Sequence, residues 1–305
     1  MNWKITLFFI ITFFPLTIAA QYFDTGFSGG ISQYVGDLQT GYEPRINNAS
    51  FGVFFRYNKT RNLAFKVQFL QTTLTGNDAF QKAIDDFEFN RNLSFQSRMF
   101  ELAVTGEWNI SQLDIRDGKT TAPYIFGGLG LLHNNPRAEL DGRWYNLQEL
   151  GTEGQTLDGG EKYSKLNLAI PFGAGLKVSL SERINLGFEF GFRLTFTDYL
   201  DDVSGNYPDL AALEKINPTA SLFSFRTPEI LPQLAGNPNG KPRGNPNDND
   251  GYFIGLITLS FNLVDGYDLE FDEQYKKFSP NYKPKRETLK SAKRALKKEE
   301  KKRKN

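Results

Sequence analysis

The side chains that could carry catalysis are sparse in this sequence of 305 residues. His133 is the single histidine, and the absence of cysteine excludes thiol catalysis, thiolate metal sites and disulfide bonds. A histidine acts as general base on a serine when a third group orients its ring. Asn134 and Asn135 follow His133, and no recognisable motif ties a serine to it. We interpret His133 as a residue at a loop entry, and a lipid-cleaving triad remains the less favoured alternative.

Two further motifs resemble ligand-binding loops but fail in detail. Residues 245–251 read NPNDNDG, yet the calcium-loop pattern would place Pro246 at its first ligand position and Ile257 where a bidentate glutamate belongs. The glycines around Ala174 lack the strand-to-helix setting of a nucleotide fingerprint. We therefore expect no metal, no cofactor, no small-molecule substrate and no enzymatic activity.

Charged residues instead recur at alternate positions between apolar ones. Residues 184–196 read INLGFEFGFRLTF, with an apolar side chain at every second position and Glu189 and Arg193 on the opposite face. Period two indicates a β-strand with one apolar face. Thirteen residues exceed the usual strand of about five or six and suffice to cross a bilayer at a tilt, which takes about nine to eleven. The pattern predicts a transmembrane strand.

Seven other segments show related patterns and complete a candidate barrel. The linkers after the second, fourth and sixth strands are short, and those after the first, third, fifth and seventh are long, as periplasmic turns and extracellular loops are. We predict an all-β fold: an eight-stranded antiparallel transmembrane β-barrel of the outer membrane, spanning 21–263, with both termini periplasmic. The predicted strands are 23–35, 50–57, 63–73, 98–110, 123–132, 166–180, 184–196 and 252–263.

An eight-stranded barrel has room inside only for side chains, so the polar faces must fill the lumen. Buried charges are tolerated when they are paired. We expect a plug of ion pairs, and a proton or ion path is the alternative. The residues assigned to this lumen are Arg56, Lys66, Glu101, Glu107, Glu189 and Arg193.

The two ends of the chain differ from the barrel. Residues 1–20 have a basic start at Lys4, an apolar run and small residues before Gln21, as in a secretory signal peptide. Residues 264–305 form a charged tail that is expected to lie in the periplasm and to bind no nucleic acid. It could bind an acidic periplasmic protein, anionic lipid of the outer membrane, or nothing. The candidate partner-binding residues are Arg286, Lys290, Lys293, Arg294, Lys297 and Lys298.

Several loop motifs resemble those of the PorG family, an outer-membrane component of the type IX secretion system of Bacteroidota. They are YVGDL at 34–38, LSF at 93–95, TEGQ at 152–155, IPFG at 170–173 and TDYLDDVS at 197–204. The resemblance spans about residues 22 to 263. It implies a scaffold that ties a periplasmic ring of PorK- and PorN-like proteins to the outer membrane. The long basic tail is not part of this pattern, so a ring-binding role for it is a separate hypothesis.

The family-motif loop residues allow two interpretations. The carboxylates among them could cap turns and bond loop amides, or they could form a direct partner site. The alternative for the whole protein is a general outer-membrane barrel that anchors the envelope or binds surfaces. The residues concerned are Gly36, Asp37, Asp198, Tyr199, Asp201 and Asp202.

Overall fold

The computed structural model describes residues 23–39, 48–60, 62–80, 90–111, 120–181, 183–234 and 236–263. The chain divides into two units, 1–264 and 265–305, and all of the described residues belong to the first. The predicted signal peptide and the six tail residues proposed to bind partners lie outside the described residues.

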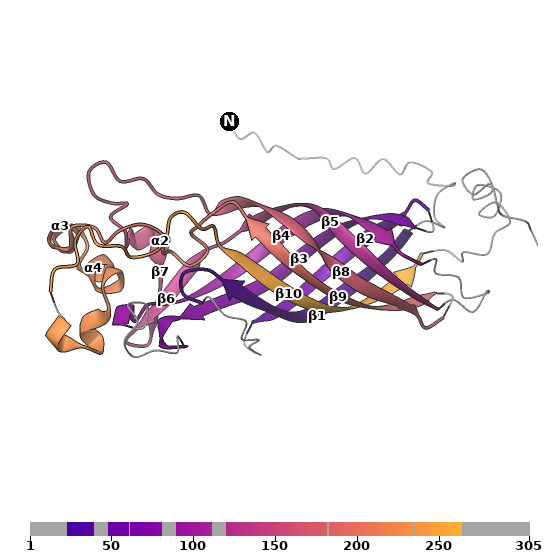
Figure 1. Ribbon diagram of the computed structural model, residues 1–305, viewed down its shortest axis with the longest axis horizontal. Coiled ribbons are helices and arrows are strands. Elements are labelled where there is room, and N and C mark those ends of the chain that lie inside the picture. Colours follow the sequence, from indigo (N-terminus) through magenta and orange to yellow (C-terminus); the bar gives the residue numbers. More distant parts are fainter. Residues whose placement is uncertain are drawn as a thin grey trace, which may run out of the picture. The chain divides into compact units, whose positions relative to one another are not determined.

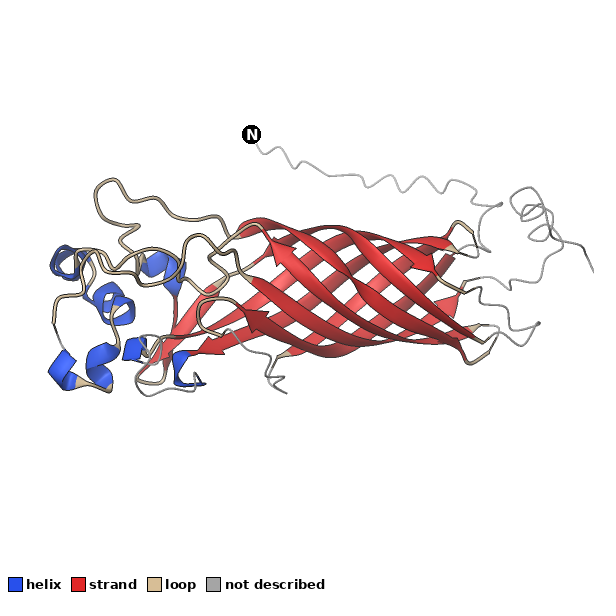
Figure 2. Ribbon diagram, in the orientation of Figure 1, coloured by secondary structure: helices blue, strands red, loops and turns tan. Residues whose placement is uncertain are grey.

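Eight antiparallel strands close into a barrel, as the sequence predicts (Figures 1 and 2). Each strand pairs with its neighbours in the chain, the β5–β8 pair spans an excursion, and β10 closes the ring by pairing with β1. The wall consists of β1 (Phe23–Val35), β2 (Ala49–Asn58), β3 (Leu63–Asn77), β4 (Ser94–Asn109), β5 (Thr121–His133), β8 (Leu166–Ser179), β9 (Ile184–Thr195) and β10 (Gly251–Asn262).

The outer surface of the barrel is apolar because the side chains that point outward, at alternate positions of each strand, are the apolar ones. Phe69 of β3 pairs with Leu102 of β4, and both are exposed. Phe190 stacks on Phe253 in the same way between β9 and β10. Exposed aromatic and aliphatic side chains on every strand of a closed wall form a surface suited to hydrocarbon rather than water. We call this surface the apolar belt.

Beyond the belt, toward the end of the barrel that carries the long connections, the alternation reverses: polar residues point outward and apolar residues point inward. Along β3 the outward residues change from Phe69 to Gln71, and along β4 they change from Phe100 to Arg98. Inward positions beyond this level become apolar and buried, as at Leu74 and Met99. The predicted strands 63–73 and 98–110 are too short at this end, because the outward apolar pattern that indicates them stops where the belt stops, whereas β3 and β4 continue.

The end of the barrel that carries the long connections is covered by ordered structure. The β5–β8 excursion contains the hairpin β6 (Pro136–Leu140) and β7 (Arg143–Asn146) and the helix α2 (Leu147–Leu150). The β9–β10 connection contains α3 (Leu210–Ile216), α4 (Pro218–Ser224), η4 (Thr227–Glu229) and η5 (Pro232–Leu234). A short helix, η2 (Asp78–Phe80), follows β3. We call this assembly of loops the cap; it lies at one end in Figure 2.

An apolar core joins the cap to the barrel mouth. Strand residues meet loop residues there, so the loops are packed onto the wall. Sequence patterns alone indicated plain loops at these connections and gave no sign of the core. Its buried members are Tyr34, Leu38, Leu74, Leu93, Phe95, Met99, Leu132, Ala138, Leu147, Ala169, Leu200, Val203, Phe223 and Tyr252.

Candidate functional site

Two side-chain contacts span the barrel interior from opposite walls. Lys66 Nζ on β3 lies 2.5 Å from Glu189 Oε2 on β9, and these strands are opposite each other in the ring of eight. Tyr252 on β10 donates a hydrogen bond of 2.5 Å to Glu101 on β4, again across the ring. Such contacts are possible only where the lumen is filled by side chains.

Glu107 is the centre of the charge network. Its carboxylate lies 2.9 Å from Arg56, 2.7 Å from Lys177 and 3.5 Å from Lys66. Arg56 also forms an ion pair of 2.9 Å with Asp24 at the start of β1. The three cations around Glu107 are also balanced by other carboxylates, since Asp24 pairs with Arg56 and Glu189 pairs with Lys66.

The lumen charges balance in the described strands. The six predicted lumen residues all point inward and are buried. Asp24 and Lys177 complete the set, giving four basic and four acidic side chains. The sequence indicated Lys177 on a polar face, and Asp24 could have been found by its even spacing from Ser28. A neutral, cross-braced interior fits a structural plug, because each buried charge has an opposite partner.

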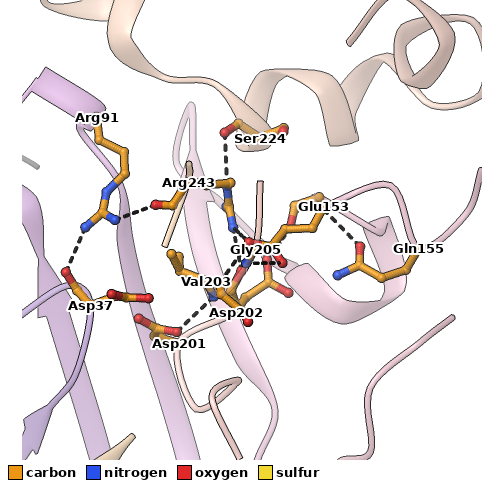
Figure 3. A network of polar contacts seen from close by, with 12 residues as sticks. Asp37, Arg91, Glu153, Gln155, Asp201, Asp202, Val203, Gly205, Ser224 and Arg243 are labelled. Atoms are coloured by element: carbon orange, nitrogen blue, oxygen red, sulfur yellow. Dashed lines mark hydrogen bonds and ion pairs between the residues drawn. The ribbon is translucent and has the colours of Figure 1, made fainter. Parts of the chain in front are cut away.

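At the mouth, two buried arginines connect all four outer loops (Figure 3). Arg91 binds both carboxylate oxygens of Asp78, at 2.6 and 2.9 Å, and donates to the carbonyl oxygens of Asp37 and Arg243. Arg243 donates to Glu153 at 2.8 Å and to the carbonyl oxygen of Asp202. Loss of either guanidinium would leave several buried acceptors without partners.

A second group of contacts joins β1 to the start of β10 and to the loop after β9. The hydroxyl oxygen of Tyr34 lies 2.6 Å from Asp201 Oδ2 and 2.8 Å from Asp250 Oδ1. The other oxygen of Asp201 accepts from the backbone amide of Val203, and the other oxygen of Asp250 accepts from that of Leu200. We call Tyr34, Asp201 and Asp250 the mouth triad.

The mouth triad requires one extra proton. A phenol carries a single proton and donates only one of the two hydrogen bonds, so the other contact needs a protonated carboxyl that donates to the phenol oxygen. Burial, and then the charge of Asp250, hold the pKa of Asp201 well above its usual value. Burial likewise raises the pKa of Asp250, with Asp198 adding to the effect. One proton is therefore held by the pair.

The neighbouring acids are also buried. Asp202 accepts from Tyr163 at 2.6 Å and from Thr152, and its backbone has a φ of 73°, which is uncommon outside glycine. Burial raises the pKa of Asp202 to about 7 against the opposing charge of Arg243. Burial also raises the pKa of Asp198 to about 7. Tyr199 stacks on Tyr163 with ring centroids 4.4 Å apart.

Gly36 and Asp37 lie beside the mouth triad. A Cβ at Gly36 would lie 1.9 Å from Asp250 Oδ1 and 2.2 Å from the Tyr34 hydroxyl oxygen. Asp37 Oδ2 accepts the backbone N–H of Asn245 at 3.0 Å. The predicted motif residues thus lie in the loops at the mouth. Asp37 and Asp201 accept hydrogen bonds from loop amides, and Asp202 accepts from the side chains of Thr152 and Tyr163.

His133 lies apart from this cluster. Its side chain is exposed at the end of β5, where it pairs with Phe100 of β4. Within the described residues no hydrogen bond joins His133 to a serine or a carboxylate.

In the part of the chain that the structure describes, no group of three or more acidic or histidine side chains is placed to hold a metal ion. None of the described helices is both long and apolar enough to cross a membrane.

The closed wall, apolar belt and filled lumen define a transmembrane β-barrel of the outer-membrane type. Residues 3–219 match the model of the family described as a domain of unknown function, DUF6089, and the chain belongs to that family. No curated protein matches the chain.

Among solved structures, the chain is similar to three bacterial barrels. The N-terminal barrel domain of OprF from Pseudomonas aeruginosa shares 8% identity over 79% of this chain and 97% of its own, with a TM-score of 0.36. Neisserial surface protein A shares 8% over 79% and 96%, with a TM-score of 0.39. Ail, the attachment invasion locus protein of Yersinia pestis, shares 10% over 79% and 98%, with a TM-score of 0.35. The fold assignment rests on the strand register of the chain itself.

Proposed function

We propose that the chain is a non-enzymatic scaffold of the type IX protein secretion machinery, tying a periplasmic ring of PorK- and PorN-like proteins to the outer membrane. The observation that carries the scaffold role is the contact between Lys66 and Glu189 across the lumen. A barrel braced in this way offers no passage for a secreted protein, so its contribution is to hold partners at the membrane. The secretion assignment comes from the PorG-like loop motifs.

In this proposal the short turns and both chain ends face the periplasm. β1 begins and β10 ends at the same end of the barrel, where Leu263 donates to the carbonyl oxygen of Phe23 at 3.0 Å. The tail that follows Leu263 then starts on the side where the ring lies. The cap faces outward.

Deletion of the gene in its host tests the proposal. Secreted cargo should accumulate in the periplasm and disappear from the medium, and a plasmid copy should restore secretion. Cargo at normal levels in the medium, in a host without a second copy of the gene, would contradict it.

A tail variant separates membrane anchoring from ring contact. Replacement of the six candidate tail residues by glutamine should reduce co-purification of the ring proteins, and exchange of lysine for arginine at the same positions should preserve it. Equal ring recovery with both variants would remove the tail from the proposal. The barrel itself would then have to make the contact.

The cap favours a second candidate, a surface-binding or envelope-anchoring barrel. Ile216 on α3 and Leu222 on α4 are 59% and 57% exposed on a structure held firmly at the mouth. Exposed apolar side chains on an ordered surface are typical of binding sites. Normal cargo secretion after deletion, together with weaker adhesion or altered envelope integrity, would favour this candidate.

A further inference from the structure

One side of the barrel carries a polar, basic site at the upper edge of the apolar belt. Alternate residues of the eight described barrel strands point outward, and Arg98 is the single Asp, Glu, Lys or Arg among them. It is exposed and lies two residues above Phe100, the last apolar outward residue of β4. A single charged side chain at the edge of the hydrocarbon-facing surface lies at the level of the lipid headgroups.

The neighbouring strands place further hydrogen-bond donors around Arg98. Thr73 of β3 is its direct partner on the outer face. β5 and β6 run along β4 in the same register, so His133 pairs with Phe100 and Arg137 pairs with Gln96, on either side of the Arg98 level. Diagonal neighbours on one sheet face lie about 7–8 Å apart. The four side chains therefore form one patch on adjacent strands.

Arg137 is held in place on this patch. It donates to Gln96 at 2.8 Å, and its guanidinium carbon lies 4.8 Å from the ring centre of the half-exposed Trp144. Tryptophan is enriched at the level of membrane headgroups. Two nearby charged side chains do not interfere with this patch. Lys165 is already paired with Glu149, and Glu139 lies one outward position farther from the belt.

We propose that Arg98, Arg137, His133 and Thr73 bind the phosphate of a membrane lipid whose acyl chains lie against the belt below. The exposed side chains of Phe100, Leu131 and Leu166 form the apolar part of the site. Guanidinium groups bind phosphate through charge-assisted, often bidentate hydrogen bonds. The inference is independent of the secretion proposal, because it concerns the outer wall of the barrel.

The test measures lipid binding to the purified full-length chain in detergent micelles by native mass spectrometry. The probes are phosphatidic acid and diacylglycerol with the same acyl chains, which differ only in the phosphate. We expect phosphatidic acid to bind at least tenfold more tightly than diacylglycerol. Arg98→Gln with Arg137→Gln should remove most of that difference. Lys215→Gln with Lys241→Gln, which removes the same charge from exposed cap positions, should leave it unchanged.

Folding of each variant is checked by the heat-dependent mobility of the barrel on gels. If the double variant misfolds, Arg98→Gln alone should still weaken phosphatidic acid binding at least threefold, since Arg98 is an exposed residue whose replacement leaves the wall intact. Equal binding by wild type and variants, an equal loss in the cap control, or tight binding of diacylglycerol would overturn the proposal. Displacement of the lipid by millimolar inorganic phosphate would also overturn it, because the site would then take a free anion.

Discussion

Tyr34 and Asp201 meet at 2.6 Å although 167 residues separate them in the chain. With Asp250 they join the first strand, the last strand and the longest outer connection at one point. The cap is therefore fastened to the barrel by a contact that depends on a proton. Its strength should follow pH.

The cap should dock less firmly as pH rises. The docked state holds a proton that the open state releases, because burial raises the pKa values of Asp201 and Asp250 above the ordinary value of 3.8. Docking is then strongest near or below pH 3.8 and weakens through the raised pKa values. Hydrogen exchange of residues 196–250, corrected for intrinsic rates, should show faster local opening at higher pH.

A neutral substitution at Asp201 should flatten this pH dependence. Asparagine keeps an acceptor for the amide of Val203 and supplies a donor toward Tyr34 without a titrating proton. Asp201→Asn should hold the cap closed at high pH, and Asp158→Asn, an exposed loop control, should behave as wild type. An unchanged profile in Asp201→Asn would show that other groups set the pH response.

Tyr34→Phe should loosen the cap at neutral pH. It removes the phenol oxygen and leaves two buried carboxyls without their shared partner, at a cost of about 1–3 kcal/mol in the free energy of local opening. Hydrogen exchange of the β9–β10 connection measures this cost. Tyr145→Phe, which keeps the ring packed on Phe223, is the control and should change little.

Gly36→Ala should disrupt the same contact by crowding. The added methyl would lie 1.9 Å from Asp250 Oδ1, so Asp250 or Tyr34 must move. Gly29→Ala adds a methyl to β1 with nothing within 4 Å. We expect faster protease cleavage of the cap in Gly36→Ala only. Equal cleavage of the two variants would show that the close approach at Gly36 is not needed.

Removal of one partner of a lumen ion pair should destabilise the barrel more than removal of both. Glu107→Gln leaves three buried cations short of an anion and should reduce the free energy of unfolding by about 3–5 kcal/mol. Lys66→Met with Glu189→Met should cost much less than either single change, since no charge is then left alone. Denaturant titrations of folded barrel on gels measure these values, with Glu139→Gln as the exposed control.

The barrel should not conduct as an open pore. Lys66 and Glu189 close the lumen from opposite walls, and wild-type protein in planar bilayers should give no stable conductance steps. Lys66→Ala with Glu189→Ala should open a water-filled gap and raise conductance. Lys215→Ala with Glu139→Ala, outside the lumen, should not. Stable steps in the wild type would contradict the closed lumen.

The barrel was predictable because its determinants are local. A strand that faces lipid on one side and a crowded lumen on the other must alternate apolar and polar residues, so segments such as 184–196 show their role directly. The inward direction of Glu189 and Arg193 followed from the same period. Above the belt the apolar phase passes to the inner face, and the strand ends near Leu74 and Met99 were misplaced for that reason.

The pairings inside the barrel and the cap depended on the tertiary structure. Alternation places Lys66 and Glu189 on inner faces, but only closure of the ring brings the third and seventh wall strands together across the lumen. The motif residues Asp201 and Asp202 were recognisable in sequence, whereas the contacts with their partners, Tyr34 in β1 and Thr152 in the β5–β8 connection, were not. Sequence determined which face each strand residue takes, because that is set by its own neighbours. The fold decided which charges meet, because those contacts join residues that are remote in the chain.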